Sequence, residues 1–387
     1  MGRRVGRLER DELLLLVDDE RDVRAGLAGI IEHYGQSVVC CEDIESAQLM
    51  VEHLPISGVL ADVRLSGPFA FEGLDFIDHV SSHLPSAGVV LMTGNASSEL
   101  SKEAMLRGAS LVLSKPFSTS ELFAALEGIG CSGGNEMAES INVPSLEAIL
   151  SGHLTHSAFH PIMRLGHDGP RAIGFEALTR IKTSTPLKNP EVLFQYARRK
   201  SRLQQLEVAC ANEALRDIAT LPGEPLIFLN IHPAVLSGPE LIGSSILAAA
   251  LRHGVQPSRI VLEITEQANI DDLERCMLNI ELLREAGVRF AFDDVGVAYS
   301  HLIHIDRIRP SFLKISQDFG TSFETEIHKM KIVRNITALA HDFGCEVILE
   351  GIETQASADA AREIGVELLQ GFLFGRPLPA AELVMVH

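Results

Sequence analysis

The chain has 387 residues, 46% of them apolar, which is enough material for more than one packed core. Its 52 acidic residues outnumber its 33 basic residues, giving a formal net charge of -19. An acidic surface repels nucleic acids and anionic membranes, so the composition argues against a DNA-binding protein. A small anionic substrate would need a metal ion or a local basic group for its binding.

Six cysteines at irregular positions, without a CxxC pair, are typical of a reducing compartment. The first apolar run, from Leu13 to Val17, is followed directly by two aspartates and is too short for a signal peptide or a membrane span. We therefore expect a cytoplasmic protein without membrane insertion.

From residue 13 to about residue 129, short apolar runs alternate with amphipathic segments. This alternation predicts parallel strands connected by helices, as in a doubly wound, flavodoxin-like α/β fold. Ser118 and Glu121 have the spacing of a capping box, which predicts the start of the last helix. The predicted strands are LLLLV at 13, SVVCC at 37, GVLAD at 58, GVVLMT at 88 and SLVLS at 110.

Residues 131–144 are polar, contain several glycines and lack an apolar period, which predicts a linker. From residue 145 the apolar runs recur at longer intervals, and seven or eight such units in about 240 residues predict a TIM-like (β/α)8 barrel. We therefore expect domains at 12–130 and 145–385. The runs are AIGFEAL at 172, LIFLNI at 226, RIVLEIT at 259, RFAFDD at 289, SFLKI at 311, EVILEG at 346 and QGFLFG at 370.

Polar residues follow four of the first five strands, at the ends where open parallel sheets bind ligands. They are Asp18 and Asp19, then Asp62, Thr93 and Lys115. Three clustered carboxylates can hold a magnesium ion, which neutralises a phosphoryl group arriving on the central one, Asp62. Thr93 and Lys115 would contact the phosphoryl oxygens. Each residue alone could be a solvated loop residue, so the prediction of phosphorylation depends on the set of five.

This set resembles the response-regulator receiver family over residues 12–130, with its acidic pair, central aspartate, Thr or Ser, and Lys-Pro. The resemblance implies phosphorylation of Asp62 by a sensor histidine kinase. Two features depart from the family pattern. Val112 replaces the usual aromatic switch residue, and Ser66 replaces the usual proline in a loop that reaches its glycine only at Gly73. We expect phosphorylation without the usual aromatic readout.

The second domain carries still more acidic residues at or just past its predicted strands, at the face where barrel enzymes build their active sites. So many carboxylates would repel one another without cations, and an all-oxygen ligand set favours magnesium or manganese over zinc. Two such ions could hydrolyse a phosphodiester. The alternative, buried salt bridges and helix caps, leaves an adjacent aspartate pair unexplained. The residues are Glu176, Asn230, Glu263, Glu266, Asp293, Asp294, Lys314, Glu350, Glu353 and Gln370.

These residues lie in motifs that resemble the EAL-domain family of cyclic di-GMP phosphodiesterases, over about residues 146–384. The signature tripeptide is Glu176-Ala177-Leu178, and Arg180 follows it. The resemblance implies metal-dependent hydrolysis of cyclic di-GMP to linear pGpG. The further motifs are FLNIHP at 228, LEITE at 262, FDDVG at 292, FLKI at 312, LEGIET at 349 and QGFLFGRP at 370.

The resemblance also implies a role for each residue. Lys314 would position the nucleophilic water, Glu350 would be a candidate general base, and Glu266 would brace the loop after the aspartates. Glu353 and Gln370 would support the site. One ion would be held by Glu176, Asn230, Glu263 and Asp293, and a second by Asp293, Asp294 and Glu350. Substrate contacts would come from Glu176, Leu178, Arg180 and Gln370.

The loop after the paired aspartates departs from the family, which commonly reads DDFGTGYSSL where this chain reads DDVGVAYSHL. Ala298 replaces a glycine, and alanine costs on the order of 1 kcal/mol where positive φ is needed. We therefore expect reduced turnover. Two alternatives remain open: a cyclic di-GMP receptor that acts through protein contacts without cleavage, and output by protein contact alone.

Two further expectations concern metals and assembly. His153, His156 and His160 have a spacing that could suit zinc, but no cysteine or acid completes the set, so we expect no zinc there. The resemblance implies a homodimer or homotetramer.

Overall fold

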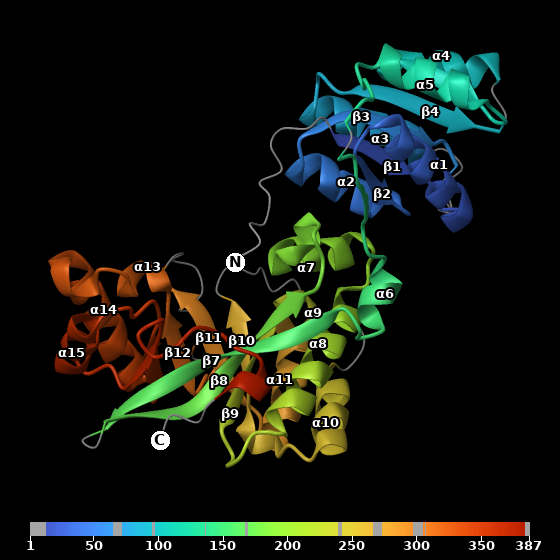
Figure 1. Ribbon diagram of the computed structural model, residues 1–387. Helices are drawn as coiled ribbons and strands as arrows, with labels where there is room; N and C mark the ends of the chain where they lie inside the picture. Colours follow the sequence, from blue (N-terminus) through green and yellow to red (C-terminus); the bar gives the residue numbers. More distant parts are fainter. Residues whose placement is uncertain are drawn as a thin grey trace. The chain divides into compact units, whose positions relative to one another are not determined.

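The computed structural model describes residues 13–64, 72–94, 97–135, 137–166, 169–238, 242–265, 273–296, 305 and 307–383. The chain forms two compact units, one comprising Met1–Leu154 with Ile181–Ser201 and the other Thr155–Arg180 with Arg202–His387 (Figure 1). Across the described ranges, no helix is both long and apolar enough to cross a membrane. The two units are described in turn.

The first unit contains a six-stranded parallel sheet in the order β5-β4-β3-β1-β2-β6, which confirms the predicted doubly wound fold. All five residues of the central strand β1 are buried, because both faces of such a sheet are covered, and this explains the uninterrupted run LLLLV. The strands are β1 (Leu13–Val17), β2 (Val38–Cys41), β3 (Ile56–Asp62), β4 (Gly88–Thr93), β5 (Leu111–Ser114) and β6 (Ser140–Asn142).

Helices connect these strands and bury their apolar sides against the sheet. The last of them, α5, begins with the predicted capping box: Ser118 accepts a hydrogen bond from the Glu121 amide, and the Glu121 carboxylate accepts one from the Ser118 amide. The helices are α1 (Arg21–Tyr34), α2 (Ile44–His53), α3 (Glu72–His83), α4 (Ser98–Leu106) and α5 (Thr119–Gly128).

Two features of this unit differ from the sequence expectations. Strand β6 lies inside the predicted linker, where it pairs in parallel with β2, Val39 opposite Ile141. The unit also includes residues from the predicted barrel domain: α6 (Leu146–Leu150), the short η1 (Pro186–Lys188) and α7 (Pro190–Arg199). The compact unit therefore extends beyond the segment predicted from the sequence.

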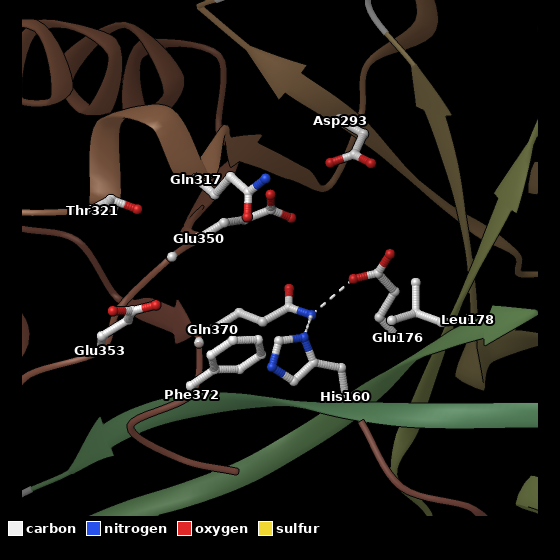
Figure 2. Close-up of a pocket in the computed structure, with 12 residues that line it drawn as sticks. His160, Glu176, Leu178, Asp293, Gln317, Thr321, Glu350, Glu353, Gln370 and Phe372 are labelled. Atoms are coloured by element: carbon white, nitrogen blue, oxygen red, sulfur yellow. Dashed lines mark hydrogen bonds between the residues drawn. The ribbon is translucent and has the colours of Figure 1, made fainter. Parts of the chain in front are cut away.

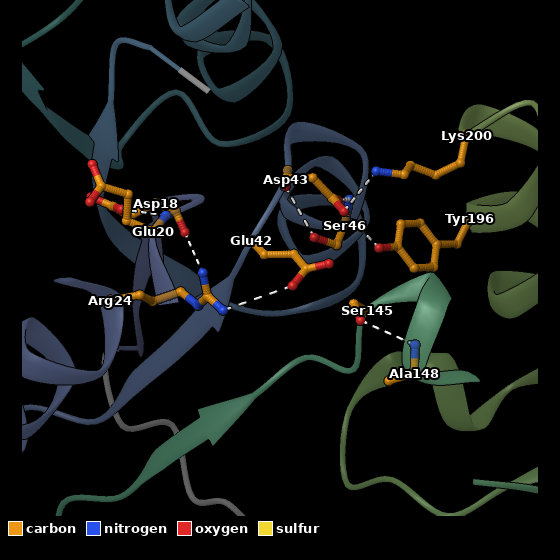
Figure 3. A network of polar contacts seen from close by, with 10 residues as sticks. All are labelled: Asp18, Glu20, Arg24, Glu42, Asp43, Ser46, Ser145, Ala148, Tyr196 and Lys200. Atoms are coloured by element: carbon orange, nitrogen blue, oxygen red, sulfur yellow. Dashed lines mark hydrogen bonds and ion pairs between the residues drawn. The ribbon is translucent and has the colours of Figure 1, made fainter. Parts of the chain in front are cut away.

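Helix α7 packs on α2 through a polar contact with a buried tyrosine. The Tyr196 hydroxyl donates to Asp43 Oδ2 at 2.8 Å, and Lys200 Nζ donates to the same oxygen at 3.0 Å (Figure 3). Asp43 is also the N-cap of α2, where its Oδ1 accepts from the Ser46 amide at 2.8 Å. One carboxylate thus caps a helix and anchors its neighbour.

The second unit is a closed eight-stranded barrel, β10-β11-β12-β13-β14-β7-β8-β9, which confirms the predicted TIM-like architecture. Six strands coincide with the predicted apolar runs, whereas the run QGFLFG overlaps β14 only at Gln370 and continues as a turn. Strand β7 is the eighth strand of the barrel. It pairs antiparallel with β14, Leu369 opposite Met163. The strands are β7 (Thr155–Gly166), β8 (Gly169–Ile181), β9 (Leu226–Ile231), β10 (Ile260–Thr265), β11 (Arg289–Val295), β12 (Phe312–Ile315), β13 (Glu346–Leu349) and β14 (Leu368–Gln370).

The barrel has apolar packing both inside and outside its sheet. Inside, side chains such as Phe228, Val261 and Phe312 form one buried cluster. A larger cluster joins the outer faces of the strands to the helices. The helical elements are α8 (Leu203–Ile218), α9 (Pro233–Leu236), α10 (Ile242–His253), η2 (Pro257–Arg259), α11 (Leu273–Glu285), α13 (Gln317–Gly320), η3 (Phe323–Thr325), α14 (Ile327–Asp342), α15 (Gln355–Glu363) and η4 (Ala380–Glu382).

Candidate active site

The first unit brings together several of the residues predicted for phosphorylation. Lys115 Nζ donates to Asp18 Oδ2 at 3.0 Å and to Asp62 Oδ2 at 2.5 Å. Burial opposes the charge on Lys115, but hydrogen bonds to the two carboxylates outweigh it and raise the lysine pKa. Thr93 is buried at the end of β4, and Asp19 lies in the turn between β1 and α1. Asp18, Asp62 and Lys115 therefore meet at the carboxyl edge of the sheet.

The barrel places one polar side chain at or near the carboxyl end of each of seven successive strands. Strand register explains the alignment: Glu263 on β10 lies opposite Asn230 on β9, and Thr265 lies opposite Asp293 on β11. These seven strands run parallel within the closed barrel, so their carboxyl ends lie at one face and the side chains converge on its centre. The seven are Glu176, Asn230, Glu263, Asp293, Lys314, Glu350 and Gln370.

Lys314 lies at the centre of this ring and is almost completely buried. Its ammonium contacts four carboxylates: Glu350 at 2.8 Å, Glu263 at 2.9 Å, Asp293 at 3.1 Å and Glu176 at 3.4 Å. Four carboxylates carry more negative charge than one ammonium can balance. The site is therefore suited to additional cations.

Two amide side chains hold Glu176. Asn230 Nδ2 donates to Glu176 Oε1 at 3.0 Å, and Gln370 Nε2 donates to Oε2 at 2.8 Å. Gln370 Nε2 also lies 2.9 Å from Nδ1 of His160, on strand β7 (Figure 2). Both oxygens of the signature glutamate are thus oriented by hydrogen bonds.

The protonation preferences of the carboxylates differ because their partners differ. Burial opposes the charge on Glu176, but Lys314 and the two amides lower its pKa. Burial raises the pKa of Glu263 well above its usual range, and the charges of neighbouring acids raise it further. It also raises the pKa of Asp293, and that of Glu350 to about 8. Lys314 alone therefore does not supply enough positive charge to keep all of these carboxylates ionised.

The donor atoms fit divalent cations. One oxygen each from Glu176, Glu263 and Asp293 lie within 4.8 Å of one another, and so do oxygens from Asp293, Asp294 and Glu350. Apart from the Lys314 ammonium, the Glu263 carboxylate has no hydrogen-bond partner among the described residues. Carboxylate oxygens are the ligands that magnesium and manganese prefer. Asp293 belongs to both groups.

The backbone around the second group is tightly constrained. Asp294 has a φ of 57°, in the left-handed region that few residues other than glycine adopt, and its amide donates to Asp293 Oδ1 at 3.0 Å. Gly320 of α13 approaches Glu350 so closely that a Cβ there would lie 1.6 Å from the Glu350 carbonyl oxygen. Only glycine fits at position 320, where it packs directly against the backbone of Glu350, the residue that follows β13.

A cavity of about 310 Å³ opens beside these carboxylates (Figure 2). Five predicted site residues other than Glu176 line it: Leu178, Asp293, Glu350, Glu353 and Gln370. The structure adds His160, Gln317, Thr321 and Phe372 to the lining. From the sequence, His160 was considered only as a zinc ligand, and the other three were missed because they carry no acidic strand-end signal.

Three predicted site features are not among the described residues that line the cavity. Arg180 does not line the cavity, and its Nη1 donates to the Thr179 carbonyl at 2.9 Å. Glu266 and residues 297–302 of the altered loop DDVGVAYSHL lie outside the described residues. The expectation of reduced turnover caused by Ala298 therefore stays a prediction.

Comparison with known families agrees with this arrangement. The EAL domain model matches residues 145–377, more than half of the chain, and the response regulator receiver domain model matches residues 14–127. The chain belongs to the EAL domain family. The signature glutamate of this EAL domain is Glu176, which lies in the carboxylate ring of the barrel.

Similar proteins include multidomain and two-domain members. The chain is 36% identical over 140 residues to the bifunctional diguanylate cyclase/cyclic di-GMP phosphodiesterase MucR of Pseudomonas aeruginosa, covering 36% of this chain and 20% of MucR. It is 27% identical over 341 residues to the cyclic di-GMP phosphodiesterase RocR of the same species, covering 83% and 84% of the two chains. The chain thus spans a fifth of MucR but most of RocR.

A solved structure of Klebsiella pneumoniae BlrP1, in complex with manganese and cyclic di-GMP, is also similar. It superposes with a TM-score of 0.53 and is 26% identical, covering 59% of this chain and 57% of BlrP1.

Proposed function

We propose that this EAL domain is a metal-dependent phosphodiesterase that hydrolyses cyclic di-GMP to linear pGpG. The observation that carries the proposal is the ring of buried carboxylates around Lys314, which opens into a cavity at the carboxyl end of the barrel. RocR and the manganese complex of BlrP1 support the same substrate and type of cofactor. The division into 12–130, 131–144 and 145–385 remains our proposal for the functional domains.

The residues of the ring have separable tasks in this proposal. Glu176, Asn230, Glu263 and Asp293 would hold one magnesium or manganese ion, and Asp293, Asp294 and Glu350 a second. When bound, such ions activate a water and stabilise the oxygens of the phosphodiester. Lys314 holds a positive charge next to Glu350, where it can orient the attacking water.

The remaining proposed roles concern proton transfer and substrate contact. Glu350 can accept the proton of the attacking water, because it lines the cavity and lies 2.8 Å from Lys314. Gln370 fixes Glu176 by its amide, Leu178 offers apolar contact in the cavity, and Glu353 lines its opposite side. Arg180 and Glu266 stay predicted contributors to substrate binding and loop support.

The decisive experiment is incubation of the purified full-length protein with cyclic di-GMP and either Mg²⁺ or Mn²⁺. Chromatography would follow the formation of pGpG, with Glu176→Ala as the control. Metal-dependent product that is absent from the control supports the phosphodiesterase. Binding of cyclic di-GMP without product would instead make the chain a receptor, and the absence of both would leave output through protein contacts.

The first unit would regulate this activity through phosphorylation of Asp62 by a sensor histidine kinase, with a magnesium ion held by Asp18, Asp19 and Asp62. The contact of Lys115 with both Asp18 and Asp62 supports this role. A phosphodonor should label the wild-type protein but not Asp62→Asn. Equal labelling of the two would contradict the proposal. A homodimer or homotetramer is the assembly that we propose for the full chain.

A further inference from the structure

A second cluster of metal-ligating side chains lies on the first unit, away from the phosphorylation residues. It consists of Glu52 on α2 and of His79 and His83 on α3, and one ligand atom from each lies within 4.8 Å of the others. His79 and His83 are four residues apart, so they project from the same side of the helix, and their rings stack at 4.2 Å between centroids. Neither the phosphorylation site nor the barrel site uses these residues.

Hydrogen bonding leaves the Nε2 atom of His83 free for a ligand. Its Nδ1 lies 2.9 Å from the carbonyl oxygen of His79. The Ser82 hydroxyl also lies 3.0 Å from Nδ1, but it donates its proton to the same His79 carbonyl at 2.8 Å. Nδ1 of the neutral imidazole therefore faces two acceptors and carries the proton, which leaves the lone pair on Nε2. Histidines that bind metal ions commonly donate their other ring nitrogen to a backbone carbonyl in this way.

His79 is arranged similarly. Its ring has a backbone hydrogen bond with Gln48, and its Nε2 has no hydrogen-bond partner among the described residues. That nitrogen lies 3.2 Å from Oε1 of Glu52. An imidazole lone pair facing a carboxylate oxygen at this distance needs a cation between them, which is either a proton or a metal ion.

The third ligand is held in place by a residue of α7. Arg199 Nη2 donates to both carboxylate oxygens of Glu52 at 2.8 Å, and its Nη1 donates to Gln48 Oε1 at 3.3 Å. The Glu52 side chain is about one-sixth exposed and therefore cannot turn away freely into solvent. Arg199 thus acts as the outer support that orients a ligating carboxylate.

We propose that Glu52, His79 and His83 form a binding site for zinc or a similar late first-row divalent cation. Two imidazoles and one carboxylate are a ligand set typical of zinc, whereas magnesium prefers oxygen ligands alone. Three protein ligands leave a fourth position for water, and the exposed His83 lies at the solvent side of the site. The site therefore differs in chemistry from the two carboxylate sites.

Cobalt(II) is the probe that separates this site from the others. The full-length protein would be titrated with Co²⁺ in saturating Mg²⁺, which occupies the all-oxygen sites. Four-coordinate Co²⁺ with nitrogen ligands absorbs visible light strongly, whereas six-coordinate Co²⁺ with oxygen ligands is pale. Zn²⁺ would then be added to displace the coloured ion.

The variants are His79→Gln, His83→Gln and, as a matched control, His53→Gln. His53 is an exposed imidazole at the end of α2, next to Glu52 but outside the cluster. We expect one strongly absorbing Co²⁺ per chain in the wild type and in the control. Its affinity should fall by at least about tenfold in the other two variants.

Two outcomes would overturn the proposal. If the wild type gives no strong absorption, a proton rather than a metal fills the gap between His79 and Glu52. If the absorption persists unchanged in both His79→Gln and His83→Gln, the ion binds elsewhere. His83 is exposed, so its variant should retain the fold and give a valid comparison even if His79→Gln unfolds.

Discussion

At the scale of single residues, Lys314 and its carboxylates set how the barrel site responds to substitution. Glu263 is fully buried, and its ionised form is compensated only in part by an ammonium that it shares with three other acids, so burial raises its pKa well above the usual range. Such a group is costly for stability and is retained where function needs the charge. Stability and activity should therefore respond in opposite directions when this charge is removed.

Glu263→Gln tests this opposition. Loss of a proposed metal ligand should lower turnover of cyclic di-GMP by at least about 100-fold, while unfolding in the presence of a chelator should occur at an equal or higher temperature. Turnover with Mn²⁺ and thermal melts measure the two effects. Glu346→Gln is the matched control, because Glu346 begins β13, at the end of that strand away from the carboxylate ring, and pairs with Arg164. Full turnover in Glu263→Gln would contradict the ligand role.

The raised pKa of Glu350 should make the metal affinity of the barrel site depend on pH. Burial raises its pKa to about 8, so the metal-free protein holds a proton there at neutral pH. A divalent ion must displace that proton, so the apparent affinity for Mn²⁺ should increase with pH and level off above about 8. The stability contributed by this protonation is present below the ordinary carboxyl pKa and is lost as the pH rises through about 8.

Calorimetric titration of the protein with Mn²⁺ from about pH 6 to about pH 9 measures this dependence. Proton release should appear as a change in the observed heat between buffers of different ionisation enthalpy. Glu350→Gln should weaken binding and flatten the profile. A wild-type affinity that is the same across the range would show that Glu350 is already ionised.

At the scale of elements, the contact between α2 and α7 depends on a buried phenol. Tyr196→Phe removes the hydrogen bond from the hydroxyl to Asp43 but keeps the ring, so the free energy of unfolding should fall by about 1 kcal/mol. Urea denaturation measures the change. Tyr34→Phe is the matched control, because the Tyr34 hydroxyl bonds Glu127 at an exposed position and should contribute less. Equal losses in the two variants would mean that burial of the Tyr196 contact adds nothing.

Sequence patterns predicted most elements because their signals are local. Buried parallel strands such as LLLLV and LIFLNI read as uninterrupted apolar runs, and the predicted runs form strands with one exception. The run QGFLFG shares only Gln370 with β14, because the glycine after Gln370 begins a turn. Strand β7 was missed because THSAFHPIMRLG alternates apolar with polar and basic residues and ends without an acidic site residue. Strand β6 was missed because three residues of a polar segment show no period.

At the scale of the whole molecule, local sequence patterns did not predict contacts between residues that are far apart along the chain. The acidic ring was predicted because each residue follows its own strand. Glu52, His79 and His83 were not singled out, since nothing in their spacing shows that α2 and α3 are neighbours. The packing of Tyr196 on Asp43, 153 residues away, was likewise outside the reach of local patterns.

The packing of α7 also means that the family boundary at residue 145 divides a compact unit. In a fragment of residues 145–387, α7 would lose α2, including Asp43 and Glu52, and its buried side chains such as Leu193 and Tyr196 would become exposed.

Hydrogen exchange detected by mass spectrometry measures this effect. Amides of α7 should exchange faster in the fragment than in the full chain, because local opening is favoured where tertiary contacts are lost. Amides of α14, which lies in the barrel unit, serve as the internal control and should be unchanged. Equal protection of α7 in both proteins would show that α2 contributes nothing to the stability of this helix.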